Sequence, residues 1–177
     1  MKKLFTILIL LSLSNCSNQI VTTSQDNIEI SSKSNQKFFK DLAKYNIWKV
    51  EITARNWDMS AKLYKISARE IERDGRAYWA YYFKSPFKRN VLMVIPDGGT
   101  FEIREPLYNN ELLERDIRID SDRAVKLAEE KGLRFFPILN MTLENRANYP
   151  EWELETKQGI YRINALDGSI KSMEDKK

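Results

Sequence analysis

Histidine is absent from this chain of 177 residues, and cysteine occurs once, at Cys16. The first absence excludes histidine-based catalytic triads and histidine metal ligands. A single cysteine excludes disulfide frameworks and the multi-cysteine centres that hold zinc or iron–sulfur clusters. Six glycines and five prolines are too few for a collagen-like or low-complexity chain. We therefore expect a globular protein that binds no metal or cofactor.

The chain also has no large excess of positive or negative charge. The chain has 29 basic and 25 acidic residues, which gives a net charge of +4. Residues 1–15 hold two of the lysines and no acidic residue, so the remainder carries 27 basic and 25 acidic residues. Such a balanced surface lacks the basic patch of a nucleic-acid-binding protein, and we expect no nucleic-acid partner.

The main hydrophobic run, Leu4–Leu13, is shorter than the roughly 20 residues that cross a bilayer as a helix. It follows Lys2 and Lys3 and has the proportions of a secretory signal. The next motif, LSNC, ends at Cys16 and resembles the bacterial lipobox. This resemblance implies a signal peptide over residues 1–15 and diacylation of Cys16, which would anchor the protein to a membrane. The alternative is an ordinary secretory signal followed by a free cysteine.

The residues after the lipobox bear on localisation. Ser17 stands where lipoproteins retained in the inner membrane carry Asp, so the resemblance implies the cell envelope, at the periplasmic face of the outer membrane in a Gram-negative source. Residues 16–36 are rich in Ser, Asn, Gln and Thr and predict a flexible tether. Twenty such residues reach about 25 Å as a random coil. An edge strand over residues 27–31 is the alternative for part of this segment.

An internal repeat organises the remaining residues. Trp79 and Trp152 stand 73 positions apart, Asp-Gly turns that end at Gly98 and Gly168 stand 70 apart, and a helical pattern precedes each copy. The sequence therefore predicts an α+β fold of two repeats, each a helix packed on an antiparallel meander sheet. The predicted boundaries are 37–105 for the first repeat, 106–117 for a linker and 118–177 for the second repeat.

Periodicity places the elements within each repeat. In the first we expect a helix over 41–57 and strands over 62–72, 77–84, 90–95 and 100–104. In the second we expect a helix over 122–131 and strands over 135–143, 151–156, 160–165 and 169–173. A helix over 59–73 is the alternative for the first strand. Ser121 is the expected cap of the second helix and Gly132 its end. The offset of 73 also matches Ile66 with Leu139 on the first strands.

Alternation along the Trp-containing strands orients the side chains. In the second repeat Trp152, Leu154 and Thr156 share one face, and the three glutamates that alternate with them take the other: Glu151, Glu153 and Glu155. The same register in the first repeat turns Trp79, Tyr81 and Phe83 toward the helix and Tyr78, Ala80 and Tyr82 outward. Tyr78 and Tyr82 are the candidate binding residues, because an exposed tyrosine offers rigid contact area with a polar tip. The alternative is that another part of the chain covers them.

The closing hairpin, YRINALDGSI over residues 161–170, and the Trp-containing strand before it resemble the PepSY domain and its relatives. Tandem units of this shape also resemble the beta-lactamase inhibitory protein architecture. Together the two units cover roughly residues 41–175. The resemblance implies an envelope module without catalytic residues that binds or inhibits other proteins, such as a peptidase.

Two other functions stay open. The protein could carry or sense a small apolar molecule held between sheet and helices. An acid-based hydrolase would need two close carboxylates in a cleft, for which the candidates are Asp97 with Glu102 and Glu151 with Glu153. The Asp-Gly turns lack the further ligands of a calcium loop.

Overall fold

The computed structural model describes residues 41–104, 111–112, 114–134, 136–146 and 149–175. All of them belong to one unit, Gln36–Lys177. The predicted signal peptide, Cys16, the predicted tether and the alternative strand over 27–31 lie outside the described residues. Among the described residues, neither helix has the length and apolar character needed to span a bilayer.

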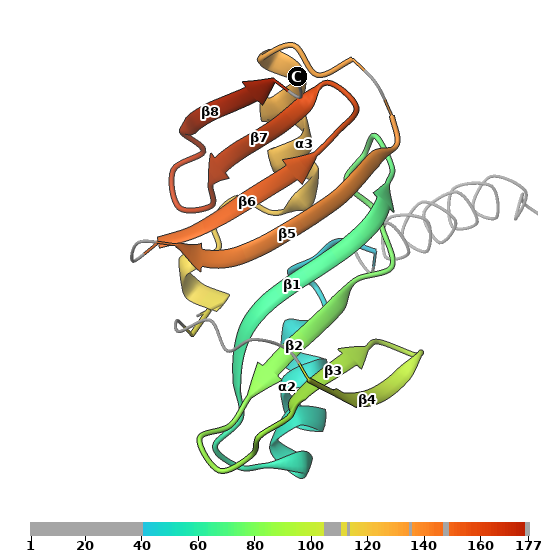
Figure 1. Cartoon of the computed structure of the whole chain (residues 1–177), viewed down its shortest axis with the longest axis vertical. Coiled ribbons are helices and arrows are strands. Elements are labelled where there is room, and N and C mark those ends of the chain that lie inside the picture. Colours follow the sequence, from blue (N-terminus) through green and yellow to red (C-terminus); the bar gives the residue numbers. More distant parts are fainter. Residues whose placement is uncertain (1–40, 105–110, 113, 135, 147–148, 176–177) are drawn as a thin grey trace, which may run out of the picture. The chain divides into compact units, whose positions relative to one another are not determined.

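Eight antiparallel strands form one sheet in the order β4-β3-β2-β1-β5-β6-β7-β8 (Figure 1). The strands of the first half are β1 (Lys62–Ile71), β2 (Ala80–Lys84), β3 (Val91–Ile95) and β4 (Gly99–Ile103). Those of the second half are β5 (Ile138–Arg146), β6 (Tyr149–Glu155), β7 (Gly159–Asn164) and β8 (Ile170–Asp175). Helix α2 (Ile47–Trp57) precedes β1, and a 3-10 turn, η1 (Glu114–Asp116), and helix α3 (Ser121–Glu130) precede β5. The predicted α+β class is confirmed.

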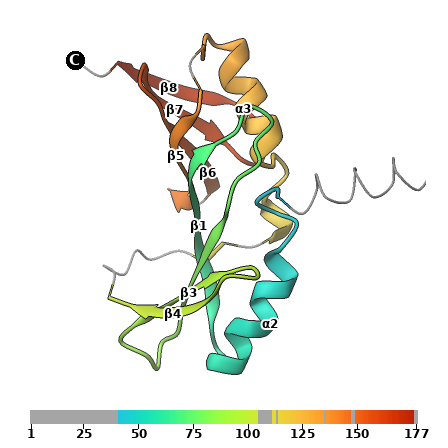
Figure 2. The same ribbon diagram turned by 90° about the vertical axis from the view of Figure 1, so that its right-hand side faces the viewer.

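Each half therefore contains a helix followed by a four-stranded meander. In both halves the first strand lies at the centre of the sheet and the last strand lies at an edge. The two meanders are joined where β1 pairs with β5 along a register that includes Ile66 opposite Leu143. Both helices cover the same side of the sheet (Figure 2). We refer to the other side as the open face.

The first half forms as its periodicity predicts. Ile47, Val50 and Ala54 are buried on one side of α2. The strand prediction for β1 is correct and the helical alternative is wrong, because Ile66 and Ala68 alternate with polar residues and are buried under the helices. Helix α2 begins six residues later than expected, since residues 41–46 form turns instead.

The turn before α2 is held by side chains from β2 and the residue before it. The Trp79 indole donates to the Asp41 carbonyl at 2.8 Å, and the Tyr81 hydroxyl donates to the Ala43 carbonyl at 2.6 Å. The Ala77 backbone N–H also donates to the Asp41 carbonyl, at 3.2 Å. Strand β2 begins at Ala80 rather than at the expected Ala77, and the Ala77 N–H bonds to the turn instead of to a strand.

Helix α3 begins one residue earlier than expected, and its cap is Asp120 rather than Ser121. The Asp120 carboxylate accepts the Ser121 backbone N–H at 2.7 Å and the Lys44 backbone N–H at 3.1 Å. Ser121 is fully buried as the first helical residue, and its hydroxyl accepts the Ala43 backbone N–H at 3.3 Å. Asp120 is the better cap here because it satisfies donors from both halves of the molecule. Gly132, with φ of +108°, follows the helix as predicted.

The pairing registers correct the alignment of the two repeats. Ile66 lies opposite Tyr81, and Met141 lies opposite Leu154. When Trp79 and Trp152 are taken as equivalent, Ile66 therefore corresponds to Met141 and not to Leu139, which is exposed. A shift of two residues leaves every side chain on the same nominal face of a strand, so hydrophobic alternation alone does not detect it.

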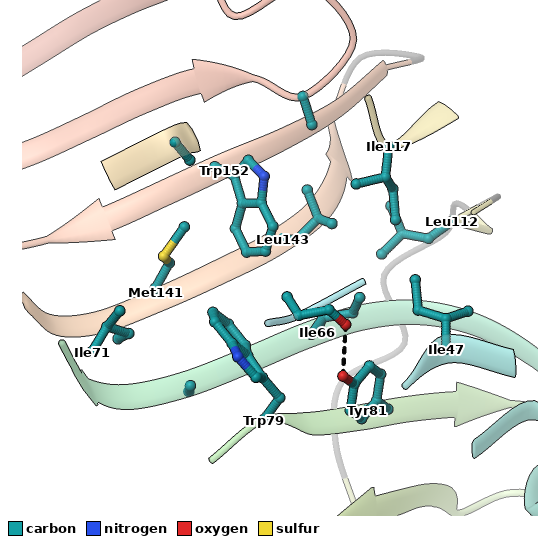
Figure 3. Packing of buried hydrophobic residues seen from close by; sticks show 14 of the residues in the cluster. Ile47, Ile66, Ile71, Trp79, Tyr81, Leu112, Ile117, Met141, Leu143 and Trp152 are labelled. Atoms are coloured by element: carbon teal, nitrogen blue, oxygen red, sulfur yellow. Dashed lines mark hydrogen bonds between the residues drawn. The ribbon is translucent and has the colours of Figure 1, made fainter. Parts of the chain in front are cut away.

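The core continues through both halves. Trp79 and Trp152 lie against each other near the junction of β1 and β5 (Figure 3), with ring centroids 5.7 Å apart and an interplanar angle of 62°. The Trp152 indole donates to the Ile119 carbonyl at 2.8 Å, as that of Trp79 does to Asp41. Each indole thus satisfies a carbonyl in the segment that leads into the helix of its own half.

Candidate functional site on the open face

The orientation predicted for the Trp-containing strands is confirmed in the first half. Trp79, Tyr81 and Phe83 are at most 2% exposed, whereas Tyr78 is 95% exposed. Tyr82 is half-buried on the open face. Tyr82 therefore lies where alternation placed it, whereas Tyr78 precedes β2 and borders a depression beside α2 as well as the open face. The role of both residues in binding stays a prediction.

Tyr82 is held by neighbours from β1. Its ring packs edge-on against Tyr64, with centroids 6.4 Å apart, and the Lys65 ammonium lies 4.4 Å from its ring centroid. The Ser67 hydroxyl donates to the Tyr82 hydroxyl at 3.3 Å. These contacts fix the ring without covering it, so Tyr82 offers a rigid aromatic surface.

Tyr78 and Tyr82 line a single depression of about 550 Å³ on this face. Lys65, Ser67 and Arg69 from β1 line it as well, with Met93 from β3 and Thr142 from β5. Its wall therefore combines aromatic and apolar area with two cationic side chains. Such a mixture suits a partner that presents an apolar group beside a carboxylate.

Lys65, Ser67 and Arg69 are residues that the sequence alone did not single out. They occupy alternate positions of β1 and join the site because Lys65 pairs with Tyr82 across the sheet. The alternation of these three residues along β1 shows that they share one face of the sheet, but it does not show which strand lies beside them. The pairing register supplies the neighbour.

The open face of the second half has a different chemistry. Glu153 binds Arg146 at 2.9 Å and Arg162 at 3.0 Å. Glu151 is 5% exposed and lies near Arg146, with its carboxylate 3.9 Å from the guanidinium. The glutamates lie opposite the helix-facing residues, as predicted, but arginines compensate their charge. This half therefore presents a polar surface of paired charges.

The carboxylate pairs considered for hydrolysis do not form an acid–base site. Asp97 is exposed and pairs with Lys49 at 2.7 Å. Glu102 accepts the Trp57 indole N–H at 2.9 Å, and this bond and one from Asn90 lower the pKa of its carboxyl. A general acid needs a raised pKa, so Glu102 has the opposite of the required shift. Glu151 and Glu153 are engaged by arginine, as described above.

Metal and apolar-ligand sites find little support in the described part of the chain. Among those residues, no cluster of three acidic or cysteine side chains has the geometry to hold a metal ion. The space between α2 and the sheet is occupied by side chains at most 4% exposed, including Ile47, Val50, Ile66, Leu92 and Val94. An apolar ligand carried there would have to displace this packing. A depression of about 530 Å³ does lie beside α2, lined by Tyr45, Trp48, Tyr78 and Ile95 among others, and the carrier function stays a prediction.

Comparisons with known proteins add little. No protein-family model matches the chain, and no curated protein matches it. A solved structure that does match is described as a "putative lipoprotein" of Clostridium difficile 630, at 11% identity and a TM-score of 0.48. The match covers 72% of this chain and 90% of that one.

Proposed function

We propose that the protein is a lipid-anchored component of the cell envelope that binds a protein or peptide through the open face of its first half and catalyses no reaction. The observation that carries the binding role is the depression shared by Tyr78 and Tyr82. The anchor is supported by the lipobox-like motif that ends at Cys16. The Clostridium difficile neighbour has a description of the same kind, but at its level of similarity it adds no support.

The chemistry of the depression favours a polypeptide that carries acidic and apolar groups. Tyr78 supplies exposed aromatic area, and Lys65 and Arg69 supply positive charge. Tyrosine and arginine are enriched at the centre of protein interfaces, and Tyr78 and Arg69 supply both here. The resemblance of the two halves to PepSY units stays a prediction, and peptidase inhibition is the specific form of binding that it implies.

Two measurements test the two parts of this proposal separately. Intact mass of the protein purified from envelope membranes tests the anchor: we expect a mature chain that begins at an acylated Cys16. A mass that corresponds to an unmodified thiol would contradict the anchor.

The binding role is tested by recovery of envelope proteins on tagged wild type and on the double variant Tyr78→Ser/Tyr82→Ser. Phe87→Ser is the matched control, since Phe87 is 81% exposed and does not line the depression. We expect a defined partner with wild type and the control, and loss of that partner with the double variant. Equal recovery with all three proteins would remove the proposed face. Inhibition of the partner's peptidase activity, if it has one, would identify the finer function.

A further inference from the structure

Helix α2 has a second apolar side besides the one that packs on the sheet, and part of it borders a depression of about 530 Å³ that Tyr78 and Ile95 also line. Trp48 is 59% exposed and Ile52 is 56% exposed, and Tyr45, in the turn before the helix, is 41% exposed. Positions 45, 48 and 52 follow the i, i+3, i+7 spacing of one helix face. We refer to these three residues as the outer stripe. The residues of α2 that pack on the sheet lie on the opposite side of the helix.

The fold does not require this stripe. Helix α3 has the same place in the second half, and its solvent side carries the exposed charged residues Arg123, Lys126 and Glu130. Arg123 and Glu130 pair at 3.2 Å. Two helices that cover the same side of one sheet thus differ in their outer surface. Exposed large apolar side chains in a row mark a surface that another body covers.

The position of the stripe along the chain indicates what covers it. The described chain begins at Asp41, four residues before Tyr45, whereas α3 lies 80 residues further on. Cys16 precedes Asp41 by 25 residues, which span at most about 90 Å when fully extended. An acylated Cys16 would therefore keep a membrane surface within that distance of the outer stripe.

The side chains also suit a lipid surface. Trp and Tyr are the residues enriched at the interface between water and lipid, and Ile adds apolar area beside them. Lys49 and Arg55 flank the stripe on α2, each with a surface ion pair that its long side chain can exchange for a lipid headgroup. Three apolar side chains bind membranes weakly alone, but a tether raises their effective concentration at the surface.

We infer that the outer stripe of Tyr45, Trp48 and Ile52 docks on the membrane to which Cys16 is anchored. This inference rests on the proposed lipid anchor. Tyr78 borders both the depression on the open face and a second depression lined by Tyr45 and Trp48, so the docked stripe would lie beside one of the two candidate binding residues.

Tryptophan quenching by brominated lipid tests the docking directly. The acylated mature protein is reconstituted into vesicles of phosphatidylcholine and phosphatidylglycerol with brominated acyl chains. Trp79 and Trp152 are at most 2% exposed and Trp57 is half-buried, so Trp48 is the tryptophan best placed to meet lipid. We expect bromine to quench part of the wild-type emission and the Trp48→Phe variant to lose that quenched component. Ile52→Glu should reduce the quenching of Trp48.

The matched control places a tryptophan on the other helix, as Lys126→Trp in the Trp48→Phe background. We expect its emission to be unaffected by bromine, and equal quenching at positions 48 and 126 would overturn specific docking. Protection of Trp48 from aqueous iodide without quenching by bromine would mean that a second copy or another protein covers the stripe, and would also overturn the inference.

Intact mass separates the two proposals. An acylated Cys16 with an unquenched Trp48 removes the docking and leaves the anchor. An unmodified Cys16 removes both.

Discussion

The two halves of the sheet share a framework and differ on their surfaces. Both contain a helix, a four-stranded meander and a buried tryptophan whose indole bonds to the segment before the helix. They differ in the outer side of the helix and in the open face, where the first half has tyrosines and the second has glutamates paired with arginines. The features that the two halves share are those that form the core. The surfaces on which they differ are those to which we assign binding.

The largest expected effect would come from removing one of the common tryptophans. Trp152 is fully buried against Trp79, so Trp152→Ala should lower the free energy of unfolding by about 3–5 kcal/mol. Urea unfolding followed by circular dichroism measures the loss. Because the rings touch, the double variant with Trp79→Ala should lose less than the sum of the two single variants. Additive losses would show that the halves are not coupled through these rings.

Gly75 tests the packing of one half on the other. It has φ of +81°, and a Cβ there would lie 2.5 Å from the Cα of Asp122 in α3. Gly75→Ala should cost about 2–4 kcal/mol, since overpacking adds to backbone strain. The control is Gly132→Ala, where φ is +108° and the added Cβ meets open space, with an expected cost of about 1–2 kcal/mol. Thermal unfolding of the two variants compares them, and equal costs would contradict the close approach.

Asp120 joins the halves through hydrogen bonds to Lys44 and Ser121. Asp120→Ala removes a helix cap and should cost about 1–2 kcal/mol in urea unfolding. Burial raises the pKa of the Asp120 carboxyl above its ordinary 3.8, and its hydrogen bonds oppose this shift only in part. The folded state then holds the proton more tightly than the unfolded state.

The pH dependence that follows has a definite sign. The contribution of the Asp120 titration to stability is complete below pH 3.8 and is lost as the pH rises through the higher folded-state pKa. Asparagine does not titrate, so in Asp120→Asn the free energy of unfolding should fall less steeply as the pH rises through this window. The asparagine side chain still offers an acceptor for one backbone N–H. Urea unfolding across the window compares it with wild type. A variant with the steeper decline would contradict the direction of the shift.

The smallest effect is expected on the open face of the second half. Glu153 makes two partly exposed ion pairs, with Arg146 and Arg162, so Glu153→Gln should cost at most about 1 kcal/mol. The cost should shrink in high salt, because screening weakens surface pairs. A larger cost that does not depend on salt would contradict this expectation. It would indicate that the fold of the second half requires these ion pairs.

Much of the local structure was predictable from the sequence. The buried stripe of Ile47, Val50 and Ala54 and the opposite faces of Tyr81 and Tyr82 follow from periods of 3.6 and 2 residues. The Asp120 cap was missed because Ser121 is also a good cap, and the choice depends on the distant Lys44 backbone. Lys65 was missed because its proximity to Tyr82 depends on strand register.

By itself, then, the order of residues determined which side chains face the core and that each half pairs a helix with a meander, because these patterns arise between neighbours a few residues apart. The tertiary structure alone decided that β1 pairs with β5, so that two predicted sheets are one, and that both helices cover the same side of it. The physical reason is that a strand edge can bond to any partner of matching register, and the choice among partners is made by packing across the whole molecule.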